Sequence, residues 1–186
     1  EVKTDRKVLV FVSHLTDKSK GAELIIEAME DVIKRVPDAK LEIIGTGPHE
    51  EKLKELVKTA DLNGVIKFLG LMDHDKLMKY LPTRGVGLAT YLDDPNSITY
   101  FADPTKPKEY LACGLPVIIT RVPWIAKEIE EKPMGIAINY DKKELVDAIV
   151  KLLKDNEFYE RCKENAKTFA SELSWDKIYS KAFLEF

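Results

Sequence analysis

The feature that most constrains this chain is a regular alternation of two kinds of segment. Short, almost wholly apolar segments, rich in β-branched residues, are typical of strands, and longer segments with apolar residues every three to four positions are typical of helices. Strands that are apolar throughout are covered on both faces, which favours a parallel sheet between helical layers. We predict strands over residues 8–14, 40–45, 65–70, 86–91, 116–120 and 135–140, and helices over 22–36, 50–61, 73–81, 106–113 and 125–132.

The predicted fold is therefore α/β and doubly wound, a Rossmann-like fold with a mostly parallel six-stranded sheet. The end of the chain is helical in pattern, over residues 142–155, 157–173 and 174–186. With 186 residues, 45% of them hydrophobic, we expect one domain spanning 1–186. A long irregular segment, residues 92–105, follows the fourth strand and should lie at the sheet edge where such folds bind ligands.

Charge and hydropathy argue against several functional classes. The net charge is −3 and the signs are interleaved, so we expect no nucleic-acid-binding face. The longest apolar runs, such as Val8 to Val12, fall far short of the ~20 residues of a transmembrane helix. No leader opens the chain, which predicts a cytoplasmic domain. The lack of glutamine beside abundant lysine and glutamate is typical of a thermophilic source.

Neither a metal site nor a reactive thiol is expected. Cys113 and Cys162 lie far apart, with no cysteine or histidine beside them at ligand spacing, and buried packing is the simpler interpretation. Asp73 and Asp75 form a D-x-D pattern. They stand at the front of a predicted helix, where acidic residues are common in any case.

Two groups of lysines suggest where an anion could bind. Lys18 and Lys20 flank the start of the first helix, and Lys106 and Lys108 lie in the first turn of the helix after the irregular segment. A helix N-terminus carries partial positive charge, so a lysine there is unfavourable by ~0.3–1 kcal/mol unless an anion is bound. Gly21 would let a ligand approach the backbone closely. Exposed lysines without a binding role remain an alternative.

The common phosphate-binding fingerprints are absent. No G-x-x-x-x-G-K-[ST] occurs, and the Gly45-x-Gly47 pair has Glu50 where a dinucleotide motif needs its third glycine. This argues against a P-loop enzyme and an ordinary dehydrogenase. The two glycines could bind a ligand or only close a tight turn.

Glu109 lies one turn inside the helix that follows the irregular segment. A capping box would need an acidic residue at 106 or 108, and both positions hold lysine. A carboxylate near an anion-binding helix end could accept hydrogen bonds from two ribose hydroxyls. A salt bridge to a neighbouring lysine is the alternative.

Several ordered blocks resemble a known family. The segment K-P-K-E-Y-L-A-C-G-L-P-V-I of residues 106–118 resembles the E-A-M-A-C-G-x-P-V-[IV] motif of retaining GT-B glycosyltransferases. The K-G of 20–21, the P-x-x-x-L-x-I-x-G-x-G-P of 37–48, the V-x-F-x-G of 65–70 and the S-W of 174–175 match in order. From about Val8 to Tyr179, the chain resembles the C-terminal, nucleotide-sugar-binding domain of glycosyltransferase family 4.

The resemblance implies roles for individual residues. Lys20 would contact the donor diphosphate, Thr105 and Lys106 would lie against the same group, and Glu109 would hold the ribose hydroxyls. The nucleobase would lie near Leu71 and Met72. The candidate binding residues are therefore Lys20, Gly21, Gly47, Leu71, Met72, Thr105, Lys106 and Glu109.

Three positions depart from the family pattern. The first glutamate of the E-x7-E pair is replaced by Phe101, which affects the expected handling of the donor sugar. His14 replaces the arginine of the G-R-L turn, which affects neutralisation of the diphosphate. Val122 and Pro123 replace a glycine pair.

The resemblance implies the donor-binding domain of a retaining glycosyltransferase, which moves a sugar from a nucleoside diphosphate sugar to an acceptor hydroxyl with no metal or other cofactor. No catalytic residue is assigned. A saccharide or lipid-linked acceptor would be held by an N-terminal domain, so this domain alone should be inactive. Trp175, Tyr179 and Phe183 would partly face that domain, and the full-length protein could lie at a membrane surface.

Two other functions remain open. A sugar-nucleotide epimerase half would need catalytic carboxylates and a histidine that the sequence does not place together. A nucleotide-binding regulatory module is the second alternative. Among such modules, a response regulator would need aspartates after the first strand, where Ser13-His14-Leu15 stands.

Overall fold

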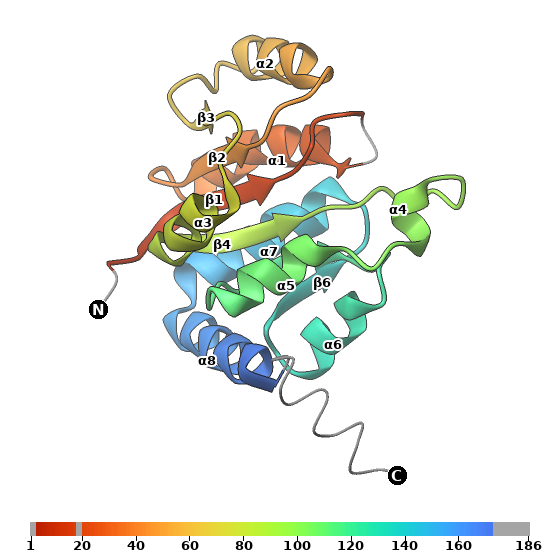
Figure 1. Ribbon diagram of the computed structural model, residues 1–186. Coiled ribbons are helices and arrows are strands. Elements are labelled where there is room, and N and C mark those ends of the chain that lie inside the picture. The colour runs from red at the N-terminus through yellow and green to blue at the C-terminus, as the bar shows by residue number, and fades with distance from the viewer. Residues whose placement is uncertain (1–2, 18–19, 173–186) are drawn as a thin grey trace.

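A single six-stranded parallel sheet forms the centre of the molecule (Figure 1). The computed structural model describes residues 3–17 and 20–172. The strands lie in the order β3-β2-β1-β4-β5-β6, and every neighbouring pair is parallel. This confirms the predicted fold class. The strands are β1 (Asp5–Val12), β2 (Lys40–Ile44), β3 (Ile66–Phe68), β4 (Arg84–Ala89), β5 (Val117–Thr120) and β6 (Gly135–Ile138).

The helices follow the predicted pattern, with one addition. A short helix, α4, interrupts the segment that was expected to be irregular. The expected third C-terminal helical segment, with Trp175, Tyr179 and Phe183, lies outside the described residues. Over the described residues, no helix has the length and apolar character needed to cross a bilayer. The helices are α1 (Ala22–Arg35), α2 (Glu50–Thr59), α3 (His74–Tyr80), the 3-10 turn η2 (Leu81–Thr83), α4 (Ile98–Phe101), α5 (Thr105–Ala112), α6 (Ile125–Glu131), α7 (Lys142–Lys154) and α8 (Asn156–Glu172).

The two faces of the sheet carry separate hydrophobic cores. Leu9 and Phe11 of β1 belong to the core under α1, α2 and α7, whereas Val10 and Val12 belong to the core under α3, α5 and α6. Figure 1 shows these helix groups on opposite sides of the sheet. The period of two along a strand explains how one apolar run supplies both cores. Cys162 is buried in the first core, which confirms its packing interpretation, and Cys113 is half-buried beside the second.

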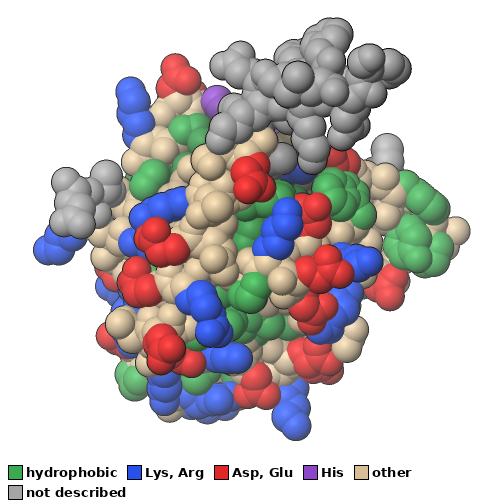
Figure 2. All heavy atoms as spheres, turned by 90° about the horizontal axis from the view of Figure 1, so that it is seen from below, with side chains coloured by type: hydrophobic (Ala, Val, Ile, Leu, Met, Phe, Trp, Pro, Cys, Tyr) green, Lys and Arg blue, Asp and Glu red, His purple; other side chains and the backbone are tan. Residues whose placement is uncertain are grey.

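Charged side chains pair across the surface rather than gathering in blocks. On the face seen in Figure 2, positive and negative side chains alternate. Asp31 of α1 contacts Lys34 at 2.7 Å and Lys142 of α7 at 2.8 Å. Hydrogen bonds from Lys142 and then Lys34 lower the pKa of Asp31 to about 2. These exposed pairs join neighbouring helices at the surface.

Tyr110 sets α5 against the sheet. Its ring is fully buried, and a Cβ added to Gly87 of β4 would come within 2.5 Å of that ring. The Tyr110 hydroxyl accepts a hydrogen bond from the Val12 N–H at 2.8 Å. The strand order reverses between β1 and β4, so this contact places the N-terminus of α5 over the crevice between their carboxyl ends.

Gly21 brings the start of α1 against the end of β4. It has φ of 74°, and a Cβ at this position would lie 1.7 Å from the Thr90 carbonyl oxygen. The Thr90 hydroxyl donates to the Gly21 carbonyl at 3.1 Å. Both the left-handed backbone and the close approach require glycine here.

We therefore expect Gly21→Ala to destabilise the protein strongly. Left-handed strain costs ~1–2 kcal/mol, and Thr90 must also move, so the free energy of unfolding should fall by at least ~2 kcal/mol. In a domain of this size that lowers Tm by ~4–8 °C, which calorimetry measures. Gly64→Ala is the matched control, because an added Cβ there meets nothing within 4 Å. An unchanged Tm for Gly21→Ala would contradict the assignment.

Tyr110→Phe should cost ~1–3 kcal/mol, because it leaves the buried Val12 N–H without its partner. The control is Tyr100→Phe, since Tyr100 is 36% exposed. Thermal melts of both variants decide the matter. Equal, small effects would mean that the hydroxyl of Tyr110 does not hold α5 in place.

Candidate functional site

Two hollows lie side by side at the carboxyl ends of the central strands. The larger, about 460 Å³, lies between the ends of β1 and β4, the start of α5 and Lys20. The smaller, about 170 Å³, lies between the ends of β1 and β2 and the β3–α3 connection. Val12, Ser13, His14 and Lys106 line both. The two hollows therefore form one cleft at the point where the strand order reverses, as such folds predict for a ligand site.

The cleft brings together five of the candidate residues. Lys20 and Thr105 line the larger hollow, Leu71 and Met72 line the smaller, and Lys106 lies where they meet. Of the described residues that line the larger hollow, two are lysines and none is acidic. This part of the cleft is therefore suited to an anion.

Glu109 and Lys106 contact each other directly. The Lys106 ammonium lies 2.8 Å from Oε2 and 3.1 Å from Oε1 of Glu109, so the structure contains the salt bridge that was the alternative for Glu109. Both side chains are largely buried, with 35% and 17% exposed for Lys106 and Glu109. The carboxylate thus lies within reach of the cleft, behind the lysine that lines it.

The N-terminus of α5 has no side-chain cap. Its N-cap residue, Pro104, makes no capping hydrogen bond, and Pro107 has no N–H to offer. The N–H groups of the first turn have no intrahelical partner and lie beside the larger hollow, which Thr105 and Lys106 line. This arrangement suits a bound anion.

The expected repulsion between lysines and helix dipoles is only partly found. Lys20 lies before the N-cap Gly21, and the first turn of α1 contains Glu23 instead, so a first-turn lysine in α1 is wrong. In α5 the placement is confirmed, but Lys106 is paired with Glu109, and Lys108 with Asp103 at 2.5 Å. These carboxylates offset the unfavourable placement without any ligand.

The candidate glycines have packing roles. A Cβ on Gly47 would lie 2.3 Å from the Leu15 carbonyl oxygen, and Gly21 packs against Thr90 in the same way. Neither glycine lines the two hollows. The close packing explains the lack of a side chain at both positions, and a binding role remains a prediction.

The charge of Glu109 affects the buried groups behind the cleft. Burial raises the pKa of the Cys113 thiol to about 11, and the Glu109 carboxylate adds to this shift. Burial and then Glu109 also raise the pKa of Tyr91 above its usual range. Cys113 is therefore a neutral thiol at pH 7, in agreement with its interpretation as a packing residue.

The positions that depart from the family pattern lie differently around the cleft. His14 lines both hollows, whereas Phe101 is 76% exposed on α4 and lines neither. Val122 and Pro123 precede α6 and line neither hollow. Asp73 is the N-cap of α3 and accepts a hydrogen bond from the Lys76 N–H at 2.9 Å. In the described part of the chain, no group of three or more potential metal ligands occurs.

Sequence reasoning missed several residues of the cleft. Ser13, Thr16 and Tyr91 line it, together with Ala102 and His74. Ser13 and Tyr91 closely follow the central strands, and a polar residue at a strand's carboxyl end is the signal that could have identified them.

Solved structures share this fold. The pneumococcal O-GlcNAc transferase GtfA, in complex with UDP and GlcNAc, superposes with a TM-score of 0.80 at 20% identity, over 98% of this chain and 36% of that one. Anabaena Alr3699/HepE, in complex with UDP and glucose, gives 0.74 at 18% identity, over 90% of this chain and 44% of that one. The shared fold is the Rossmann-like domain of GT-B glycosyltransferases.

Sequence relatives point the same way. An uncharacterized glycosyltransferase of Methanocaldococcus jannaschii is 30% identical over 180 residues, covering 95% of this chain and 44% of the relative. The alpha-monoglucosyldiacylglycerol synthase of Streptococcus pneumoniae is 24% identical, over 98% of this chain and 42% of the relative. The chain thus spans less than half the length of these relatives. The family described as glycosyl transferases group 1 matches residues 1–169, and the chain belongs to that family.

Proposed function

We propose that this chain is the donor-binding domain of a retaining glycosyltransferase of family 4. It binds a nucleoside diphosphate sugar, whose sugar passes to an acceptor hydroxyl. The single observation that carries the proposal is the cleft in which Lys106 lies between a cationic end at Lys20 and an apolar end at Leu71 and Met72. The complexes of GtfA and HepE with UDP support it.

Each part of the cleft suits one part of such a donor. The base would lie against Leu71 and Met72, and the diphosphate against the α5 N-terminus, Lys106 and Lys20. Glu109 would accept hydrogen bonds from the ribose hydroxyls. Negative charge develops on the leaving diphosphate during transfer, and fixed positive groups stabilise it without a metal ion.

The Lys106–Glu109 salt bridge would rearrange when the donor binds. At 2.8 Å each group occupies a bonding position that the donor needs. When the ammonium turns to the diphosphate, the carboxylate becomes free for the ribose hydroxyls. In the absence of donor, the salt bridge keeps both charges paired in a half-buried place.

The acceptor would be held by a further domain. Two relatives are named for lipids, the pneumococcal diacylglycerol glycolipid synthase and a phosphatidylinositol N-acetylglucosaminyltransferase component of Arabidopsis thaliana. We therefore propose a saccharide or lipid-linked acceptor and a cytoplasmic site, at the membrane surface for a lipid-linked acceptor. This chain alone would bind donor without transferring the sugar. Turnover by this chain with an acceptor panel would contradict that part.

Nucleoside diphosphates should bind more tightly than the matching monophosphates. Titration calorimetry with UDP and UMP, and with GDP and GMP, measures the difference. Lys106→Met should weaken the diphosphate ~10-fold or more, because a charge-assisted hydrogen bond contributes ~1.5–3 kcal/mol. Lys108→Met is the control, since Lys108 lies in the same turn but contacts Asp103. Equal affinity for mono- and diphosphates, or no nucleotide binding, would contradict the donor site.

Glu109→Gln should weaken a ribonucleotide ~10-fold or more while changing the affinity of its 2′,3′-dideoxy analogue far less. The reason is that the carboxylate acts on hydroxyls that the analogue lacks. Calorimetry with both ligands gives the ratio, and a thermal melt checks folding. If both affinities fall equally, or if only Tm falls, Glu109 has a structural role.

A further inference from the structure

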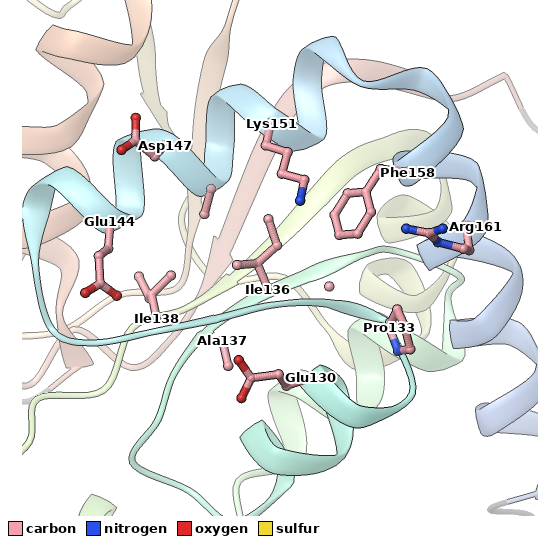
Figure 3. Close-up of a pocket in the computed structure, with 12 residues that line it drawn as sticks. Glu130, Pro133, Ile136, Ala137, Ile138, Glu144, Asp147, Lys151, Phe158 and Arg161 are labelled. Atoms are coloured by element: carbon pink, nitrogen blue, oxygen red, sulfur yellow. The ribbon is translucent and has the colours of Figure 1, made fainter.

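A third hollow lies along the edge strand β6, outside the donor cleft. It has a volume of about 470 Å³ and lies between β6, α6, α7 and α8 (Figure 3). No residue that lines it lines the cleft. Its apolar wall includes Ile136, Ile138, Phe158 and Pro133. We call this hollow the β6 groove.

The backbone of β6 is paired on one side only. The Met134 carbonyl accepts from the Val117 N–H at 3.1 Å. The Ile138 carbonyl accepts from the Arg121 N–H at 2.8 Å. Backbone groups alternate in direction along a strand, so the N–H and C=O of Ala137 point away from β5 and toward the groove.

The outward backbone groups differ in their partners. The Asn139 N–H donates to Oε2 of Glu144 at 2.7 Å, which blocks the strand edge at that end. For Ala137, no partner exists in the described part of the chain, although the residue is only 4% exposed. Buried backbone groups are almost always paired, so an unpaired N–H and C=O beside a hollow mark a place for an incoming strand.

The charges of the groove that lack an opposite partner are positive. The Lys151 ammonium lies 4.2 Å from the centre of the Phe158 ring, and the Arg161 guanidinium carbon 5.3 Å from it. Figure 3 shows the three side chains together at one end of the groove. Neither cation has a carboxylate within 4.0 Å among the described residues.

The carboxylates of the groove, in contrast, already have arginine partners. Glu130 and Glu144 share Arg121, at 2.8 and 3.8 Å, and Asp147 contacts Arg35 at 2.5 Å. Charge complementarity therefore favours an acidic occupant.

We propose that the β6 groove binds an extended acidic segment of a partner protein, which adds to the sheet as a strand beside β6. The Ala137 backbone pairs with the segment, and its apolar side chains lie on Ile136 and Phe158. An acidic side chain contacts Lys151 or Arg161. Main-chain hydrogen bonds supply affinity in this kind of recognition, and side-chain contacts supply specificity. The proposal shares no residue with the donor site and stands independently of it.

The test uses a short fluorescent peptide of alternating valine and aspartate, with a valine–lysine peptide of the same length as comparison. We expect the acidic peptide to bind and to slow exchange of the Ala137 amide hydrogen, followed by NMR. The double variant Lys151→Glu, Arg161→Glu should weaken it at least tenfold. The control, Lys127→Glu, changes an exposed lysine of α6 outside the groove.

Three results would overturn the proposal. The first is no binding of the acidic peptide up to ~1 mM, or equal binding of the basic one. The second is equal binding after N-methylation of alternate backbone nitrogens, which would indicate a small-anion site; this result needs no protein variant. The third is a concentration-dependent dimer of the chain that the double variant abolishes, which would make a second copy the occupant.

Discussion

The geometry of the cleft depends on one buried contact, between Tyr110 and the end of β1. An α-helix can lie against a parallel sheet at many positions along the strands. Here the ring of Tyr110 occupies the space left by Gly87, and its hydroxyl accepts the Val12 N–H at 2.8 Å. These two constraints fix the position of α5 along the sheet. The first turn of α5, with its unpaired N–H groups, therefore lies at the strand ends rather than over the centre of the sheet.

Close backbone approach fixes the other elements around the same crevice. Gly21 places the start of α1 against Thr90, and Gly47 places the β2–α2 turn against Leu15. The cleft is thus bounded by elements whose spacing is set by backbone contact, so a side chain larger than hydrogen cannot be accommodated. A rigid surround of this kind holds charged groups in position before a ligand arrives, which is the condition for electrostatic stabilisation.

Electrostatics distinguish the two hollows at opposite parts of the sheet. In the cleft, the Lys106 ammonium is paired with Glu109, so an anionic ligand must exchange partners with an existing salt bridge. In the β6 groove, Lys151 and Arg161 face an aromatic ring and have no described carboxylate partner. A ligand there gains a first ionic partner for these cations. The cleft is built for selective replacement and the groove for addition.

The sequence by itself determined the elements and the family, because burial imposes local periods of two and 3.6 on strands and helices. It also placed Lys20 and Lys106 at the carboxyl edge, since parallel strands end at the same edge. Only the tertiary structure decided which groups touch. The salt bridge of Lys106 with Glu109 and the unpaired backbone of Ala137 depend on how α5 packs and on the order of the strands. Both are relations between segments far apart in the chain, and no local periodicity encodes them, because they are set by how the helices cover both faces of the sheet.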